Sequence, residues 1–154
     1  MKSHLLIIGV FAGLMLTACS GRQDKEIVSR NFYNNTWNRF DYINSTLSVI
    51  NINDVYQLLM DVKLTDDYPD EYVQFNLSIF YPNDGGYRSN NFRYRVKDVN
   101  GKWLNDKVDG FYNFEFSINS KLEFSDKGDY KFMIENKYPK FDLMGINSLR
   151  LHIK

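Results

Sequence analysis

The stretch YVQFNLSIFY, residues 72–81, determines the fold class that we predict for this chain. Its apolar and polar residues alternate with a period of two, which is the side-chain period of a β-strand. The apolar set is Val73, Phe75, Leu77, Ile79 and Tyr81, and the polar set is Gln74, Asn76 and Ser78. An amphipathic helix would instead repeat its apolar residues every three or four positions. We therefore expect a half-buried strand here.

Five further segments show the same alternation, at 56–64, 91–97, 112–118, 130–134 and 149–153. The sequences between them contain residues that tolerate positive φ and so favour turns, at 83–86, 100–101, 109–110 and 127–129. Short strands at this spacing, each with one polar face, favour two antiparallel sheets packed face to face. The sequence thus predicts an all-β protein, an antiparallel two-sheet β-sandwich that is Ig-like or jelly-roll-like.

The N-terminus has the pattern of a lipoprotein signal peptide. Lys2 provides a positive charge, residues 5–16 are apolar, and Leu16-Thr17-Ala18-Cys19 is a bacterial lipobox that contains the only cysteine. As a helix the apolar segment would be about 18 Å long, too short to span roughly 30 Å of hydrocarbon core. We expect cleavage before Cys19 and attachment to the membrane through acyl chains on that cysteine, because two or three chains anchor a protein stably.

The resulting domain organisation is a signal peptide at 1–18, a lipidated cysteine with a flexible tether at 19–31, and a β-sandwich domain at 32–154. The tether is predicted from the run of polar and charged residues that follows the cysteine. Since that cysteine is assigned to lipid, no disulfide is expected in the domain. The chain has 19 basic and 19 acidic residues, and this balance argues against nucleic-acid binding.

Few residues of the processed chain suit catalysis or metal binding. His4 is removed with the signal peptide, so His152 is the only histidine, and its place on the polar side of the last strand predicts a solvated residue rather than a general base. One imidazole does not supply a zinc site built from His and Cys ligands. No glycine-rich phosphate loop leads from a strand into a helix. We expect no enzymatic activity, no cofactor and no metal.

Two charged clusters have ordinary structural interpretations. Four acidic residues flank Tyr68-Pro69 and match no calcium loop, so we interpret them as a solvated turn, with a cation site as the alternative: Asp66, Asp67, Asp70 and Glu71. Three basic residues line one face of a strand, as a solvated face or a protected sheet edge, with a partner contact as the alternative: Arg93, Arg95 and Lys97.

Three aromatic residues are candidates for contact with a partner or a glycan: Trp37, Tyr68 and Trp103. A tryptophan of a β protein either fills the core or forms a stacking platform for sugar rings, and the sequence leaves both interpretations open. With the loops around Tyr68-Pro69 and at 105–110, these residues form the predicted contact surface.

Several short motifs follow one another along the chain in a distinctive order. After the lipobox come Trp37 and Phe40, Tyr68-Pro69, Phe75-Asn76-Leu77, Gly101-Lys102-Trp103-Leu104, then Gly128, Tyr130, Phe132 and Ile134, and finally Leu143, Gly145-Ile146, Leu149, Leu151 and Ile153. In this order the chain resembles the GldH family of gliding-motility lipoproteins from Bacteroidetes. It departs from that family at Asn105-Asp106-Lys107, where a glycine-rich turn is expected, and at Lys137-Tyr138, where members tend to have a Met-Arg pair.

The resemblance implies a cell-envelope lipoprotein without enzymatic activity, needed by the gliding apparatus and its associated type IX secretion functions. Its partners would be envelope proteins of that machinery. Ser20 stands where enterobacterial inner-membrane lipoproteins have aspartate, so we expect the outer membrane, and the tether's lack of an acidic run favours the periplasmic side. The alternative function is that of a surface lipoprotein that binds carbohydrate, which requires exposed tryptophans.

Overall fold

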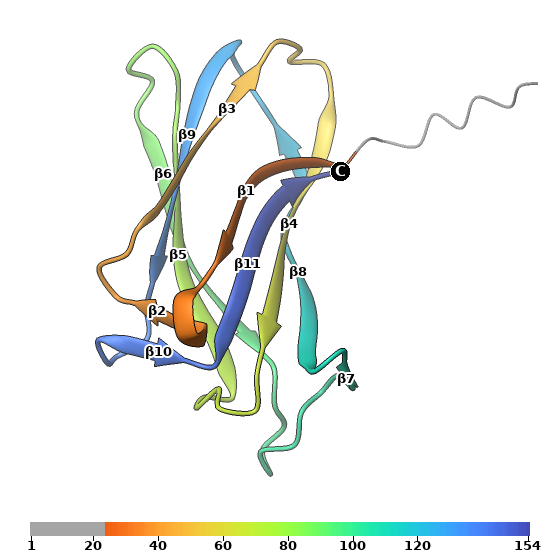
Figure 1. Ribbon diagram of the computed structural model, residues 1–154. Helices are drawn as coiled ribbons and strands as arrows, with labels where there is room; N and C mark the ends of the chain where they lie inside the picture. Colours follow the sequence, from red (N-terminus) through yellow and green to blue (C-terminus); the bar gives the residue numbers. More distant parts are fainter. Residues whose placement is uncertain (1–23) are drawn as a thin grey trace, which may run out of the picture.

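The computed structural model describes residues 24–154, which form a β-sandwich of two antiparallel sheets (Figure 1). The five-stranded sheet has the order β1 (Lys25–Asn31), β11 (Ile146–Ile153), β4 (Val55–Leu64), β8 (Phe111–Glu123) and β7 (Lys107–Val108). The four-stranded sheet has the order β3 (Ile43–Val49), β9 (Gly128–Asn136), β5 (Tyr72–Phe80) and β6 (Tyr87–Arg95). A two-stranded ribbon of β2 (Thr36–Asn38) and β10 (Asp142–Met144) follows the 3₁₀ turn η1 (Tyr33–Asn35). The predicted all-β antiparallel sandwich is confirmed.

The core lies between the sheets, where the alternating strands place their apolar side chains. Phe75 of β5 and Met60 of β4 are both fully buried there. Tyr94 of β6 and Phe116 of β8 join the two sheets, because their rings stack with centroids 4.4 Å apart and an interplanar angle of 6°. The Tyr94 hydroxyl also donates to the Ser117 carbonyl at 2.7 Å. The two sheets are thus held together by packing of aromatic rings, in a domain that contains no cysteine to form a disulfide.

The polar face of β5 is less exposed than its alternation suggests. Asn76 and Ser78 are buried, because β5 is an interior strand between β6 and β9. Their polar atoms are satisfied by each other and by β6: the Ser78 hydroxyl donates to Asn76 Oδ1 at 3.1 Å, and Asn76 Nδ2 donates to Asn91 Oδ1 at 3.0 Å. Burial without these partners would be costly.

The predicted tether is wrong from Lys25 onward. Residues Lys25–Asn31 form β1, which pairs with β11 along its whole length. Only Ile27 of this strand is buried, so the segment lacks the apolar alternation of the other strands. An edge strand needs little apolar surface of its own when its neighbour supplies the ladder of hydrogen bonds. The predicted signal peptide at 1–18 and the lipidated Cys19 lie outside the described residues.

The expected turns occur where the sequence placed them, with positive φ at Asn83, Asp84, Gly110 and other turn residues. Gly145 has an additional steric role between β10 and β11. Its φ is +76°, and an added Cβ would lie 2.7 Å from the carbonyl carbon of Asp67 and closer still to the backbone of Tyr68. The close contact lets the Thr65 N–H donate to the Gly145 carbonyl at 2.8 Å. Because position 145 has no side chain, the turn that contains Asp66, Asp67, Asp70 and Glu71, here called the acidic turn, packs directly against the chain just before β11.

Candidate functional site

Two of the three predicted contact residues belong to the core. Trp37 of β2 is 0% exposed, and its indole Nε1 donates to the Asp41 carbonyl at 2.8 Å. Tyr68 is 2% exposed, its hydroxyl donates to the Tyr72 carbonyl at 2.9 Å, and burial raises the pKa of Tyr68 far above its ordinary value. A partner or sugar cannot reach either ring, so the contact prediction is wrong for both. Each lies near a turn in sequence, but its side chain is part of the buried core.

Trp103 is half-buried and is held by its own protein. Its ring stacks on Tyr112 with centroids 3.9 Å apart, and Lys97 Nζ lies 4.4 Å from its centroid. The Lys97 ammonium also donates to the Tyr68 carbonyl at 2.6 Å, and desolvation lowers the pKa of Lys97. The Trp103 ring is thus covered by contacts with Tyr112 and Lys97, which stabilise the loop that follows β6. The structure thus favours a packing role for Trp103.

The acidic turn has the arrangement of a solvated turn. Asp66 forms an ion pair with Lys107 and accepts a hydrogen bond from the Tyr112 hydroxyl at 3.1 Å. These two hydrogen bonds hold the pKa of the Asp66 carboxyl below its usual range. Asp70 accepts from the Tyr72 N–H at 3.2 Å. Within residues 24–154, the carboxylates of this turn do not converge on a common point as metal ligands would.

Two of the three basic residues, Arg93 and Arg95, lie on β6, which is an edge strand of the four-stranded sheet, whereas Lys97 lies beyond the end of this strand. The guanidinium carbon of Arg93 lies 3.7 Å from the centroid of the Tyr72 ring, and Arg95 hydrogen-bonds to the Tyr72 hydroxyl. Charged side chains on an edge strand oppose pairing with another chain. The interpretation as a protected sheet edge is therefore supported. Both arginines contact Tyr72 of the neighbouring strand β5, and these contacts fix their positions.

A group of exposed apolar side chains, here called the distal patch, lies at the end of the sandwich that carries the β2–β10 ribbon. Its members come from η1, from the segment after β2 and from β10 with the residue before it: Tyr33, Phe40, Tyr42, Phe141 and Met144. Phe40 and Phe141 are 64% and 67% exposed, yet their ring centroids are only 5.9 Å apart. In Figure 1 the β2–β10 ribbon is at the opposite end from the start of β1 and the C-terminus. Sequence reasoning missed this patch, because its two halves meet only when β2 pairs with β10.

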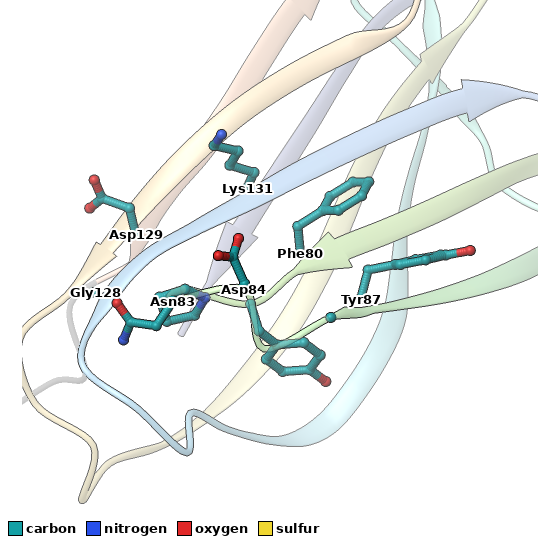
Figure 2. A pocket seen from close by; sticks show the side chains of 10 residues that line it. Phe80, Asn83, Asp84, Tyr87, Gly128, Asp129 and Lys131 are labelled. Carbon is teal, nitrogen blue, oxygen red and sulfur yellow. The ribbon is translucent and has the colours of Figure 1, made fainter.

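A shallow pocket of about 610 Å³ lies at the β5–β6 hairpin. Figure 2 shows Phe80, Asp84 and Tyr87 around this hairpin, with Asp129 and Lys131 on the neighbouring strand β9. The rings of Phe80 and Tyr87 are stacked, with centroids 5.4 Å apart. An aromatic face bordered by carboxylate and ammonium groups offers both stacking and hydrogen bonds to a polar ring.

His152 is not the solvated residue that its position predicted. It is 1% exposed on the outer face of the five-stranded sheet, and its Nδ1 lies 2.7 Å from Asp24 Oδ1. The prediction was wrong because the charged side chains of neighbouring strands cover this part of the outer face. The imidazole approaches Asp61 and Glu115, and each of the three residues offers one ligand atom within 4.8 Å of the others. Sequence analysis considered only His152 of this group; Asp61 lies on β4 and Glu115 on β8.

Among residues 24–154, no helix is long and apolar enough to cross a membrane.

The sequence was also compared with known proteins. A comparison with functionally curated proteins finds no match. The family model described as "GldH lipoprotein" matches residues 28–153, which include all of the sandwich except its first few residues. The chain therefore belongs to the GldH lipoprotein family.

Proposed function

We propose that this protein is a lipid-anchored, non-enzymatic accessory component of the gliding-motility and type IX secretion apparatus. It binds an envelope protein of that machinery through the distal patch. Family membership supports a lipoprotein linked to gliding motility. The observation that carries the proposed contact is the exposed Phe40–Phe141 pair at the end of the sandwich remote from the start of β1.

The composition of the distal patch favours a protein partner. Aromatic residues and Met are enriched in the buried centres of protein interfaces, and the adjacent Phe40 and Phe141 rings expose such a surface. Polar contacts fix the segment that carries the patch: Arg30 pairs with Asp41 at 2.9 Å, and Asn38 Nδ2 donates to Asp142 Oδ1 at 2.8 Å. A partner therefore meets a surface that is already ordered, and less conformational entropy is lost on binding.

The proposed anchor complements this arrangement. A chain that approaches the membrane from the start of β1 leaves the distal patch at the far end of the domain. Confinement at the membrane raises the effective concentration toward the millimolar range, so a modest interface suffices. We place the domain at the outer membrane on the periplasmic side. Replacing Cys19 by Ser should move the protein from the membrane fraction to the soluble fraction and abolish its labelling by a clickable palmitate analogue.

The test of the partner contact is recovery of the tagged, acylated protein from its host envelope after mild crosslinking, with mass spectrometry of what accompanies it. The double variant Phe40→Ser/Phe141→Ser should lose most of the motility or secretion proteins that the wild type recovers. Tyr87→Ser is the matched control, because Tyr87 is also aromatic and is 65% exposed, but lies on the β5–β6 hairpin. Equal recovery by the double variant and the wild type would refute the proposed contact.

The second candidate function is binding of carbohydrate at the β5–β6 hairpin, which the stacked Phe80–Tyr87 pair and the adjacent carboxylates favour. Titration of the protein with a panel of soluble glycans, followed by NMR, should then perturb the signals of Tyr87 and Gly86. Tyr87→Ala should abolish the perturbation, whereas Phe141→Ala should preserve it. Recovery of polysaccharide-utilisation proteins in the crosslinking experiment would also favour this candidate over the first.

A further inference from the structure

The outer face of the five-stranded sheet carries a cluster of polar residues around a buried histidine. The Nε2 atom of His152, on β11, lies 3.3 Å from Oδ2 of Asp61, on β4. That nitrogen is buried and has no hydrogen-bond partner. Glu115 of β8 lies directly opposite Asp61 in the register of the two strands. Three adjacent strands thus direct one nitrogen and two carboxylates toward one point.

We infer that His152, Asp61 and Glu115 bind one divalent transition-metal ion of the zinc type, through Nε2 and one oxygen from each carboxylate. The three ligand atoms all lie within 4.8 Å of one another. Zinc bonds of 2.0–2.2 Å at a tetrahedral angle place two ligand atoms about 3.4 Å apart. The separation of 3.3 Å between His152 Nε2 and Asp61 Oδ2 has this value before any adjustment.

Asp24 prepares the imidazole for this role. A histidine binds a metal as the neutral ring, and the hydrogen bond at its other nitrogen decides which nitrogen keeps the lone pair. The ionised Asp24 carboxylate lies 2.7 Å from Nδ1 and can only accept a hydrogen bond, so it favours the tautomer with the proton on Nδ1 and the lone pair on Nε2. Arg150 holds the arrangement by donating to Asp24 Oδ2 at 2.5 Å and to Asp61 Oδ2 at 3.1 Å.

The charges of the cluster favour a divalent cation. Its ion pairs contain four carboxylates but only two basic groups. The carboxylates are those of Asp24, Glu26, Asp61 and Glu115, and the basic groups are those of Arg150 and Lys154. With a neutral imidazole, two negative charges are left over, and a divalent ion would neutralise them. Asp61 and Glu115 lie directly opposite each other on adjacent strands, and like charges in this position repel. Arg150 and Lys154 each pair with one of them, and a cation bound between the two carboxylates would relieve the repulsion further.

The donor set also restricts which ion is bound. Calcium and magnesium take oxygen ligands, whereas an imidazole nitrogen suits zinc, cobalt and nickel. Glu115 is on the solvent side of the cluster and pairs with Lys154 at 2.8 Å. Both side chains are long and exposed, so Glu115 can turn from Lys154 to the ion. Water would complete the coordination of the ion.

The inference is tested with the acylated protein purified in detergent after cleavage before Cys19, because removal of residues 1–18 leaves His152 as the only imidazole. After removal of metals with EDTA, Co²⁺ should bind at one equivalent and produce d–d absorption bands that Zn²⁺ abolishes. By isothermal titration calorimetry, Glu115→Gln should weaken Zn²⁺ binding at least tenfold. Asp24→Asn should weaken it by about 10- to 100-fold, which is the effect expected of a residue that orients a metal ligand.

Asp66→Asn is the matched control, because it removes one carboxylate from an ion pair of the acidic turn and should leave the Zn²⁺ affinity unchanged. Glu115→Gln keeps the test decisive if variants of buried His152 do not fold. A Zn²⁺ affinity equal in Glu115→Gln and wild type, or binding at several equivalents with no effect of Asp24→Asn, would overturn the inference. Neither outcome depends on the proposed partner of the distal patch.

Discussion

Replacing Trp37 by Ala is expected to lower the free energy of unfolding by about 3–5 kcal/mol, the cost typical of removing a large aromatic side chain from a core. The ring is fully buried and packs against Phe32 with centroids 5.2 Å apart. The substitution also removes the indole N–H that donates to the Asp41 carbonyl. For a domain of this size the loss corresponds to a fall of roughly 10–20 °C in Tm.

Trp103→Ala is the matched comparison, since both substitutions remove one indole ring. Trp103 is only half-buried, so we expect a loss of about 1–2 kcal/mol, roughly half of the transfer free energy of a fully buried side chain. Urea unfolding followed by far-UV circular dichroism gives both values, provided that the slope m is unchanged. The chain has two tryptophans, so the fluorescence of Trp103→Ala reports on Trp37 alone and should be blue-shifted and protected from acrylamide.

A Trp37→Ala protein with the wild-type unfolding midpoint would refute this reasoning, and so would emission from Trp37 that acrylamide quenches freely. Either result would mean that the ring is at the surface, where a partner or a sugar could reach it. Because 3–5 kcal/mol is a large part of the usual stability of a domain, Trp37→Ala can fail to fold. Trp37→Phe then replaces it, with an expected loss of about 1–3 kcal/mol from the missing hydrogen bond.

Two further predictions concern the acidic turn. Gly145→Ala should destabilise the protein by more than about 2 kcal/mol in urea unfolding, since it combines a positive φ with a clash against Tyr68; Gly110→Ala, with φ +85° and open space, should cost only about 1–2 kcal/mol. Similar losses in both would remove the steric argument. Lys107 keeps the pKa of the Asp66 carboxyl below its usual range, so this carboxylate stabilises the fold above its unfolded pKa and ceases to do so as pH falls through its folded pKa. An NMR titration of Lys107→Met should show that pKa rising, and an unchanged value would contradict the role of Lys107.

The regular strands of the sandwich were the most predictable part of the structure. The six predicted strands all occur, and β5 extends over 72–80, almost the predicted range. The strand β3 was missed because Ser45 interrupts the alternation of Ile43, Leu47 and Val49, and β2 and β10 were missed because each is only three residues long. Such elements have too little local pattern of their own and form because a distant partner supplies hydrogen bonds.

The candidate sites were less predictable, for the same physical reason. The sequence left Trp37 open between the core and a contact surface, and it placed Tyr68 in the contact surface. Both rings are buried, and this depends on which strands pack around them. For metal ligands the sequence analysis counted only histidines and cysteines around His152, whereas the nearest candidate ligands in the fold are carboxylates. The register that sets Asp61 opposite Glu115 joins residues far apart in the chain, and no local pattern reports it.

By itself, the sequence determined the all-β class, most of the long strands, the turns with positive φ and the motifs that resemble the GldH family. These depend on the alternation of side chains along a strand and on the backbone freedom of single residues, which are local properties. Only the tertiary structure decided that β1 joins the sheet, which aromatic rings form the distal patch, and which carboxylates surround His152. Burial and proximity depend on which strands become neighbours, and that is settled by the packing of the whole chain.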